Sequence, residues 1–397
     1  MVILKIIKYG KKNGLIKTIN KCFEKINGCL NPFFVRHCPF KINNKKIIFS
    51  NFNGKGYGYD PKYICDELIK KDGFLLYWVT KDKQSKESLP KGVKSVHLGS
   101  LKYYYHMATS KVWIDDVRKG SEICKRPGQY YLQTWHGFIP LKKIEKDVIH
   151  TLSKNYVEDA IHDSQLIDVI LSSSETRSRL IRRAFWYDGE IMEVGCPRND
   201  IFFHHDIKDP FVYKTLGIEN TKRLAIYAPT FRQDGSIDAY NLDFDKVKKA
   251  LCERFCCDFT WIVRLHPNLE GIDIKQTFGT DVVDGSIVQD AQWLFANVDI
   301  LISDYSDCLF EAALGRIPVF IYASDIDSYM KERDFYTKLT DLPFSISKNN
   351  DEMIFAVTSF DDKEYYKKLD DFWITQGLFE KGDATKKIVK WVIEKTM

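Results

Sequence analysis

The chain has 397 residues, of which 44% are hydrophobic and 28% charged, a composition typical of a globular protein with two or three domains. No uncharged apolar run approaches the ~18 residues of a membrane-spanning helix, and no signal-peptide pattern is present, so we expect neither a membrane-spanning nor a secreted protein. The ten cysteines form no C-x-x-C pair and no zinc-like spacing with histidine, which favours a reducing, cytosolic compartment.

Positive charge is concentrated at the N-terminus. Residues 1–46 contain eleven lysines and arginines and a single acid, Glu24, whereas the whole chain carries only +5, so the remainder is net acidic. Apolar residues are interleaved with these lysines, as in basic amphipathic segments that lie on anionic membranes. We therefore expect residues 1–44 to form a membrane-associating arm. A solvated helix packed on the next domain is the alternative; nucleic acid is not expected, because no recognition motif accompanies the charge.

From residue 46 onward, strand and helix signals alternate, which predicts parallel sheets covered by helices on both faces. A glycine-rich turn follows the first strand, and Asp60 with Pro61 is expected to open a helix as N-cap and first-turn proline. The negative group at that helix disfavours phosphate binding there. The strands expected in this half are 47–49, 74–79, 93–98, 112–114, 130–133, 168–171 and 191–194.

A second run of the same kind begins at residue 222. It contains a predicted helix at 244–255 and predicted strands at 224–227, 259–265, 282–283, 300–302 and 319–322. We predict an α/β protein with two Rossmann-like domains that face a central cleft, at residues 45–205 and 206–360. Helices in residues 361–397 are expected to pack across both domains.

The stretch 299–311 combines a strand, a polar turn and the start of a helix, which Gly315 and Pro318 close. Ser303 and Ser306 lie in or next to that turn. The free N–H groups and positive dipole end of such a helix favour a phosphate. A simple N-cap at Ser306 or Asp307 is an alternative of equal weight.

A histidine follows a strand of the first half, in Trp135-His136-Gly137. At a strand end beside a glycine turn, His136 is expected to face the cleft and to titrate near neutrality, which suits a general base. A hydrogen-bonded structural histidine is the alternative, and on spacing alone it is slightly favoured.

Three further polar groups stand at strand ends: Arg264 with His266, Thr230 with Arg232, and Arg198. Arginine and histidine can bind phosphate oxygens, although Arg198 could equally pair with an acid. Each group is a weak signal alone. Their shared position at strand ends is what favours a functional interpretation.

These motifs together resemble the CDP-glycerol glycerophosphotransferases of teichoic acid and capsule synthesis. The resemblance runs in order from about residue 45 to the C-terminus and implies a GT-B fold, with an acceptor domain before a nucleotide domain. The matching stretches are Gly54-Lys55, Pro61-Lys62-Tyr63-Ile64, Trp135-His136-Gly137, Leu141-Lys142-Lys143-Ile144, Gly195 with Pro197-Arg198-Asn199-Asp200, Tyr227-Ala228-Pro229-Thr230 with Arg232, Arg264-Leu265-His266-Pro267, Asp304-Tyr305-Ser306, Glu311 and Pro318.

The resemblance also implies roles for individual residues. His136 would deprotonate the acceptor hydroxyl, and His266 with Arg264 would bind the donor pyrophosphate. Ser303 and Ser306 would hold phosphate oxygens. Further residues are assigned to the donor site (Thr230, Arg232 and Glu311, the last at the ribose) and to the cleft around it (Gly137, Arg198 and Asp304). No cofactor and no metal are expected, since Asp115-Asp116 is the only candidate metal pair and an exposed strand-end pair is favoured instead.

The implied activity is transfer of an alditol phosphate from a CDP-activated donor, such as CDP-glycerol or CDP-ribitol, to a polyprenyl-linked or growing glycan, with release of CMP. The expected location is the cytoplasmic face of a bacterial membrane. Phe138 and Asp307 replace a threonine and a serine that are common in the family, which leaves the identity of the alditol open. A GT-B sugar-nucleotide glycosyltransferase and a non-catalytic glycan-binding subunit are the alternatives.

Overall fold

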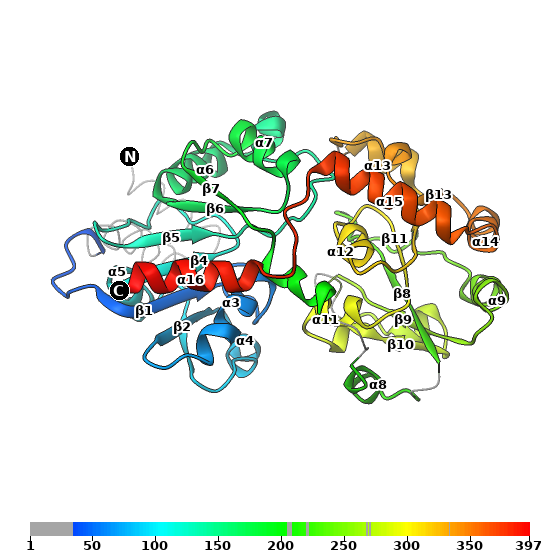
Figure 1. Ribbon diagram of the computed structural model, residues 1–397, viewed down its shortest axis with the longest axis horizontal. Coiled ribbons are helices and arrows are strands. Elements are labelled where there is room, and N and C mark those ends of the chain that lie inside the picture. Colours follow the sequence, from blue (N-terminus) through cyan, green and yellow to red (C-terminus); the bar gives the residue numbers. More distant parts are fainter. Residues whose placement is uncertain (1–34, 205–208, 220–221, 267–268, 270, 333) are drawn as a thin grey trace, which may run out of the picture.

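The computed structural model describes residues 35–397, apart from 205–208, 220–221, 267–268, 270 and 333. Two parallel β-sheets with flanking helices form two lobes side by side (Figure 1). The predicted α/β fold with two Rossmann-like domains is confirmed. The predicted membrane arm of residues 1–44 lies mostly outside the described residues.

The first sheet has seven strands in the order β3-β2-β1-β4-β5-β6-β7. Its central strands are apolar because both faces are buried: Ile48 packs into one core cluster, while its neighbours Ile47 and Phe49 pack into another. The strands are β1 Asn43–Ser50, β2 Leu75–Thr80, β3 Val93–His97, β4 Ser110–Asp115, β5 Tyr130–Gln133, β6 Val169–Ser172 and β7 Glu190–Glu193.

The second sheet has six strands in the order β10-β9-β8-β11-β12-β13. The edge strand β13 was not predicted, since it has three residues and Ile346 is its one apolar side chain. The strands are β8 Arg223–Ala228, β9 Phe259–Val263, β10 Val282–Asp284, β11 Ile300–Ser303, β12 Val319–Tyr322 and β13 Ser345–Ser347.

Helices flank both sheets. Those of the first lobe are α3 Tyr59–Ile69, α4 Lys83–Glu87, α5 Leu101–Thr109, η1 Glu145–Thr151, α6 Lys154–Leu166 and α7 Glu175–Ala184. Then η2 Pro197–Phe203 leads to the helices of the second lobe, which are α8 Phe211–Leu216, α9 Phe244–Phe255, α10 Ile274–Phe278, η4 Gly285–Ile287, α11 Ala291–Ala296, α12 Cys308–Leu314, α13 Ile326–Glu332, η5 Leu339–Asp341 and α14 Asn350–Thr358.

The last two helices contact different lobes (Figure 1). In α15 (Asp362–Gln376), Leu369 and Phe372 belong to a core cluster of the second lobe. In α16 (Ala384–Thr396), Ile388 and Val392 share a core cluster with Ile47 of β1. The chain therefore passes between the lobes a second time after α15.

The start of α3 differs from the prediction. The helix begins at Tyr59 with Gly58 as its N-cap residue, so Asp60 lies inside the first turn and the predicted N-cap role is wrong. The Asp60 carboxylate is fully buried and forms an ion pair with Arg198 instead.

Candidate active site

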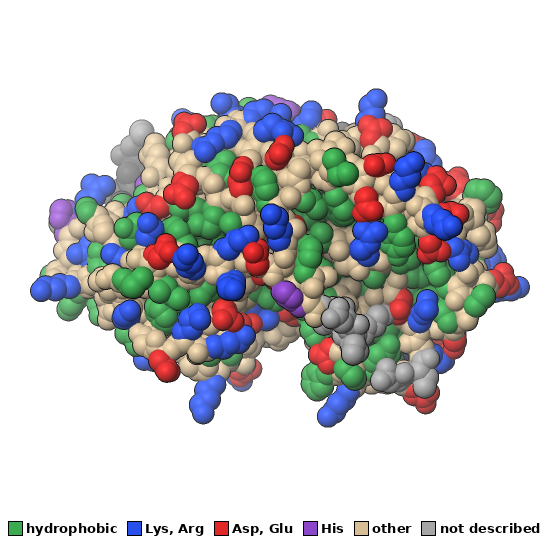
Figure 2. Space-filling view, in the orientation of Figure 1, with side chains coloured by type: hydrophobic (Ala, Val, Ile, Leu, Met, Phe, Trp, Pro, Cys, Tyr) green, Lys and Arg blue, Asp and Glu red, His purple; other side chains and the backbone are tan. Residues whose placement is uncertain are grey.

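The strand order of each sheet reverses once, between β1 and β4 and between β8 and β11. At these points Ser50 lies opposite Asp115, and Ala228 lies opposite Ser303. Sheets of this kind bind ligands outside the carboxyl ends of their strands, at the reversal. The surface is indented between the two lobes (Figure 2). The predicted site residues lie at or after the carboxyl ends of strands in the two sheets.

His136 follows β5, and its ring packs against two aromatic side chains. Trp135 stacks on it at a centroid distance of 4.5 Å, and the Phe52 ring lies 5.1 Å away. Nδ1 of the imidazole is 2.8 Å from the main-chain oxygen of Asp116. Because a carbonyl oxygen only accepts hydrogen bonds, Nδ1 carries the proton and Nε2 keeps its lone pair.

The protonation of His136 differs from the expectation of a group that titrates near neutrality. Burial, with a contribution from the charges of Arg198 and Arg177, lowers the pKa of His136 to about 4. The imidazole is therefore neutral at physiological pH, with its proton on the nitrogen that faces Asp116.

The backbone around His136 is strained. Phe52, Asn53 and Trp135 have positive φ angles of 40°, 55° and 57°, a region that residues with side chains seldom adopt. Such conformations persist where the surrounding structure enforces them, and they cluster at functional sites. The two loops that hold His136 thus share a feature of active sites.

The turn that contains Gly137 contacts the second lobe. The Phe138 ring is fully buried in the core of that lobe, 6.1 Å from the Trp373 ring. The Asp307 carboxylate lies near the Phe138 backbone, and a Cβ atom on Gly137 would lie only 3.3 Å from Asp307 Oδ2. Burial raises the pKa of Asp307 to about 6. The two positions where the chain departs from the family pattern therefore contact each other.

Arg198 is fully buried and connects the two lobes. Its Nε donates to Glu311 Oε1 at 2.8 Å, its Nη1 pairs with Asp60, and its Nη2 donates to the His136 main-chain oxygen at 3.2 Å. Glu311 Oε2 accepts from Gln292 at 2.9 Å. Both carboxylate oxygens of Glu311 are thus bonded within the protein, so these contacts give no support to its implied role at the ribose.

The two serines of the central stretch differ in their surroundings. Ser303 is fully buried, and its hydroxyl donates to the Ala228 main-chain oxygen at 2.6 Å. That contact holds β11 to β8 and gives no support to a phosphate-binding role. Ser306 is partly exposed, and its Oγ lies 3.4 Å from the Cys308 nitrogen at the start of α12.

Arg232 is held by two carboxylates. Its guanidinium pairs with Asp304 at 2.9 Å and with Asp325 at 2.6 Å, and Asp304 Oδ1 also accepts from the Thr230 N–H at 2.8 Å. The Thr230 hydroxyl is buried without a partner among the described residues. Because two carboxylates offset its charge, the Arg232 guanidinium holds the loop after β8 in place and is not a free cation for a ligand.

Arg264 and His266 follow β9. Arg264 Nη1 donates to the main-chain oxygens of Gly285 and Val288 at 2.7 and 2.5 Å, and burial lowers its pKa. His266 is exposed, with its ring 5.5 Å from the Phe231 ring. The structure therefore fixes Arg264 by its main-chain contacts and leaves the His266 side chain accessible to solvent.

Residues of the first lobe reach this part of the second lobe. Partial burial and the charges of Lys55 and Lys142 lower the pKa of His266. The Tyr59 ring lies 4.7 Å from the Phe52 ring, within the first lobe. Burial raises the pKa of Tyr59, and the charge of Arg264, from the second lobe, opposes the rise. Lys55 and Lys142 stand in the matching motifs, but no residue pattern showed that they would approach His266.

Asp116 was also missed. The sequence favoured an exposed strand-end pair with Asp115 over a metal pair, and the exposure is wrong, since both side chains are buried. The main-chain oxygen of Asp116 orients His136, and its Oδ1 accepts from the Phe52 N–H at 2.8 Å. Its partner Asp115 pairs with Lys119 at 2.5 Å. Among the described residues no group of three or more His, Cys, Asp and Glu side chains could hold a metal ion.

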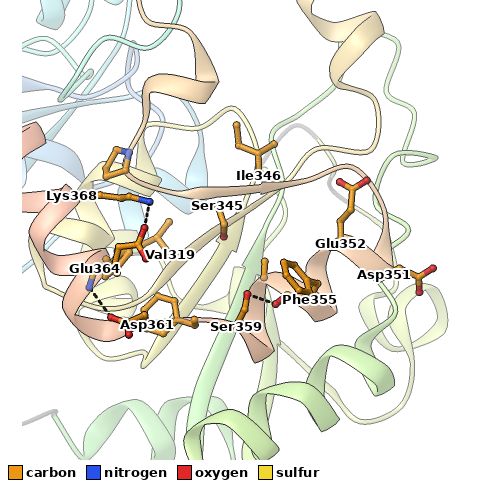
Figure 3. A pocket seen from close by; sticks show the side chains of 14 residues that line it. Val319, Ser345, Ile346, Asp351, Glu352, Phe355, Ser359, Asp361, Glu364 and Lys368 are labelled. Atoms are coloured by element: carbon orange, nitrogen blue, oxygen red, sulfur yellow. Dashed lines mark hydrogen bonds and ion pairs between the residues drawn. The ribbon is translucent and has the colours of Figure 1, made fainter.

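A cavity of about 600 Å³ lies elsewhere on the second lobe, between β13, α14 and α15 (Figure 3). Its wall carries Asp351, Glu352, Asp361 and Glu364, and Lys368 pairs with Glu364 at 2.6 Å. None of the predicted site residues lines it, so we do not assign it to the active site.

In the described part of the chain, no helix is both long and apolar enough to span a bilayer.

The family follows from a sequence comparison. Residues 32–394 match the model of the CDP-glycerol:poly(glycerophosphate) glycerophosphotransferases. The chain belongs to this family. The resemblance inferred from the motifs is thereby confirmed.

The curated relatives of this chain that follow are teichoic acid enzymes. It is 28% identical to the teichoic acid poly(glycerol phosphate) polymerase of Bacillus subtilis (strain 168), over 97% of this chain and 54% of the relative. It is 30% identical to the teichoic acid glycerol-phosphate transferase of Staphylococcus aureus (strain NCTC 8325 / PS 47), over 89% and 94%. The chain thus spans about half of the first relative and nearly all of the second.

Solved structures support the GT-B fold. The wall teichoic acid polymerase TagF superposes with a TM-score of 0.82 at 25% identity, covering 99% of this chain and 98% of that one. A UDP-N-acetylglucosamine 2-epimerase from Listeria monocytogenes, at 10% identity and a TM-score of 0.52, shares the fold alone.

Proposed function

We propose that the protein transfers glycerol phosphate from CDP-glycerol to a hydroxyl of a lipid-linked or growing cell-surface glycan and releases CMP. Membership of the family and the similarity to a glycerol-phosphate transferase support this donor. The observation that carries the proposal is the neutral His136, whose Nε2 is free to accept a proton on a strand-end loop of the first lobe.

In the proposed reaction, an acceptor hydroxyl attacks the phosphorus that bears the glycerol. A new P–O bond forms to the acceptor, the P–O bond to CMP breaks, and CMP leaves with the bonding electrons. The acceptor proton passes to His136 Nε2. Phosphoryl transfer depends mainly on positioning and on stabilising charge, both of which fixed side chains can supply.

The second lobe would hold the donor. His266 is exposed there, and the charges of Lys55 and Lys142 act on it, so positive charge of the first lobe lies near this strand end of the second lobe. Such a position suits the diphosphate of the donor and the negative charge that develops on CMP. Arg264, Ser306 and Thr230 are placed on neighbouring strand ends and would complete the donor site.

A screen of activated donors tests this proposal. The purified full-length protein is incubated with CDP-glycerol, CDP-ribitol and UDP-sugars, together with an acceptor, and the released nucleotide is identified. We expect CMP from CDP-glycerol. Release of CMP from CDP-ribitol alone would replace glycerol by ribitol. Release of UDP would indicate a glycosyltransferase, and failure to bind any of these nucleotides in calorimetry would favour a non-catalytic subunit.

A further inference from the structure

Tyr59 is an aromatic residue of the first lobe to which the proposed reaction gives no role. It is the first residue of α3, and the loop that leads to it starts at the carboxyl end of β1, where the strand order of the first sheet reverses. Doubly wound sheets bind their ligands at this point. The Tyr59 side chain is partly exposed, so a ligand can reach it.

The Tyr59 ring belongs to the same aromatic cluster as His136. The Phe52 ring contacts both, with its centroid 4.7 Å from that of Tyr59 and 5.1 Å from that of His136. The Arg198 guanidinium lies 5.6 Å from the centre of the Tyr59 ring, and its Nη2 donates to the His136 main-chain oxygen. Two separate contacts therefore place Tyr59 beside the loop that carries the proposed base.

The backbone at Tyr59 is strained in the same way as the backbone around His136. Its φ angle is 53°, close to the 57° of Trp135. Residues with side chains seldom adopt this region, and such strain persists where the surrounding structure enforces it, often at functional sites. The fold thus holds Tyr59 in a conformation that a tyrosine ordinarily avoids.

The face of α3 that carries Tyr59 is turned towards the second lobe. Tyr63 follows one helical turn later on that face, and its hydroxyl donates to Asp290 of the second lobe at 3.0 Å. The charges of Glu311 and Arg264, which belong to the second lobe, also act on Tyr59. Tyr59 is therefore placed where the lobe of the proposed base meets the lobe that would hold the donor.

The hydroxyl of Tyr59 differs from those of the neighbouring tyrosines. Tyr57 donates to Asp66 at 2.6 Å and Tyr63 donates to Asp290, whereas no hydrogen bond joins the Tyr59 hydroxyl to the residues that the structure describes. Burial raises the pKa of Tyr59, so the phenol keeps its proton at physiological pH and can donate it in a hydrogen bond. An uncharged donor beside arginine side chains suits an oxygen of a phosphate group.

We propose that the Tyr59 hydroxyl donates a hydrogen bond to an oxygen of the phosphoryl group that is transferred. The inference rests on the proposed function and adds to it a catalytic residue that lies outside the strand-end motifs. In phosphoryl transfer the charge of the reacting group is spread over its equatorial oxygens, and catalysis comes from positioning and electrostatic stabilisation. A fixed, uncharged donor supplies both to one of these oxygens.

The test is the variant Tyr59→Phe, which removes one hydroxyl and keeps the ring against Phe52. We expect kcat for CMP release from CDP-glycerol to fall roughly ten- to a hundredfold, because a donor to a reacting oxygen is lost. The Tm should stay at the wild-type value, since the hydroxyl has no bond to the described part of the protein.

The matched control is Tyr57→Phe, which removes a hydroxyl two residues earlier in the chain. It loses the bond to Asp66, so its Tm should fall while its kcat stays at the wild-type value. The two variants should therefore show opposite patterns of stability and rate. The proposal is overturned if Tyr59→Phe keeps the wild-type kcat, or if both variants lose kcat to the same extent.

A binding measurement separates this proposal from the proposed reaction. Phosphorus NMR compares CDP-glycerol bound to the wild-type protein and to Tyr59→Phe, without an acceptor. We expect the signal of the phosphorus that bears glycerol to move between the two proteins, and the signal of the CMP phosphorus to move less. Unchanged signals, or a change confined to the CMP phosphorus, would overturn the contact even if CMP is released. Absence of CMP release by the wild-type protein, with the glycerol-bearing phosphorus still sensitive to Tyr59→Phe, would overturn the reaction and leave the contact standing.

Discussion

The most informative residue is His136, because its surroundings fix both its charge and its tautomer. Its pKa is lowered to about 4, well below the ordinary value for histidine. A general base must be unprotonated, so activity is lost only as the pH falls through the pKa of the free enzyme.

We therefore predict that kcat/KM for CMP release shows no decline near pH 6.5. It should fall only as the pH approaches 4. The measurement is a pH–rate profile from pH 4.5 to 8, with folding followed by circular dichroism at each pH. A half-maximal rate near pH 6.5 in the folded protein would show that His136 is not the base, or that burial does not set its pKa.

A second residue-scale feature is Glu380, which follows α15. It is buried, and its Oε1 accepts from the Cys196 N–H at 2.9 Å and from the Asn199 amide at 3.1 Å. Burial raises its pKa to about 8. An acid whose pKa is higher in the folded state stabilises the fold below its unfolded pKa, and that stability is lost as the pH rises through the folded pKa.

Glu380→Gln is uncharged at every pH and keeps the acceptor oxygen. We expect the Tm of the wild-type protein to fall relative to this variant between about pH 5 and 8. In this range the unfolded state has lost the proton, whereas the folded state still holds it. Thermal unfolding at several pH values gives the comparison, with Glu364→Gln, an exposed acid of α15, as control. Parallel curves for wild type and Glu380→Gln would contradict this account.

At the scale of elements, Arg198 of η2 joins α3 of the first lobe to α12 of the second through Asp60 and Glu311. All three side chains are buried. Removal of one member of such a network leaves unpaired charge in the interior.

We predict that Arg198→Ala lowers the free energy of unfolding by about 3–5 kcal/mol. Arg179→Ala serves as control, because Arg179 is 67% exposed and its pair with Glu175 should contribute about 1 kcal/mol or less. Urea unfolding of both variants provides the measurement. Equal midpoints would show that the buried network does not stabilise the junction.

The elements themselves were largely predictable, whereas their contacts were not. The strands with long apolar runs, such as β8 and β11, and the helix α9 lie close to the predicted positions. The strand β13 was not predicted because it is short and has a single apolar residue. Periodicity reports burial along one element, so it reveals most where both faces of a strand are covered.

Side-chain partners far apart in the sequence were beyond reach. His136 and Arg198 were predicted from their positions at strand ends. However, the hydrogen-bond partner of Arg198 is Glu311, which is 113 residues away in the sequence. The pKa of His136 is low because it is buried among segments that no local sequence pattern connects. The serine Ser303 matched a motif, yet its hydroxyl bonds to the neighbouring strand. A motif identifies which residues matter more reliably than it identifies what they touch.

For the whole molecule, the uneven charge of the sequence suggests attachment to a membrane through residues 1–44, which remains a prediction. Deletion of residues 1–34 should reduce sedimentation with anionic liposomes at low salt, since attraction to the surface is screened by salt. Vesicles of neutral lipid are the control, and CDP-glycerol binding shows that the shortened protein is folded. Unchanged binding to anionic vesicles would refute the membrane role.

The central claim is that a neutral imidazole from one lobe takes the proton of an acceptor hydroxyl, which attacks a diphosphate donor that the other lobe holds. The most direct measurement combines donor affinity with CMP release in His136→Ala and in His266→Ala. We expect His136→Ala to bind CDP-glycerol with the wild-type Kd and to release no CMP above background, and His266→Ala to lose donor affinity. Near-normal CMP release by His136→Ala, or unchanged donor affinity in His266→Ala, would contradict that division of roles.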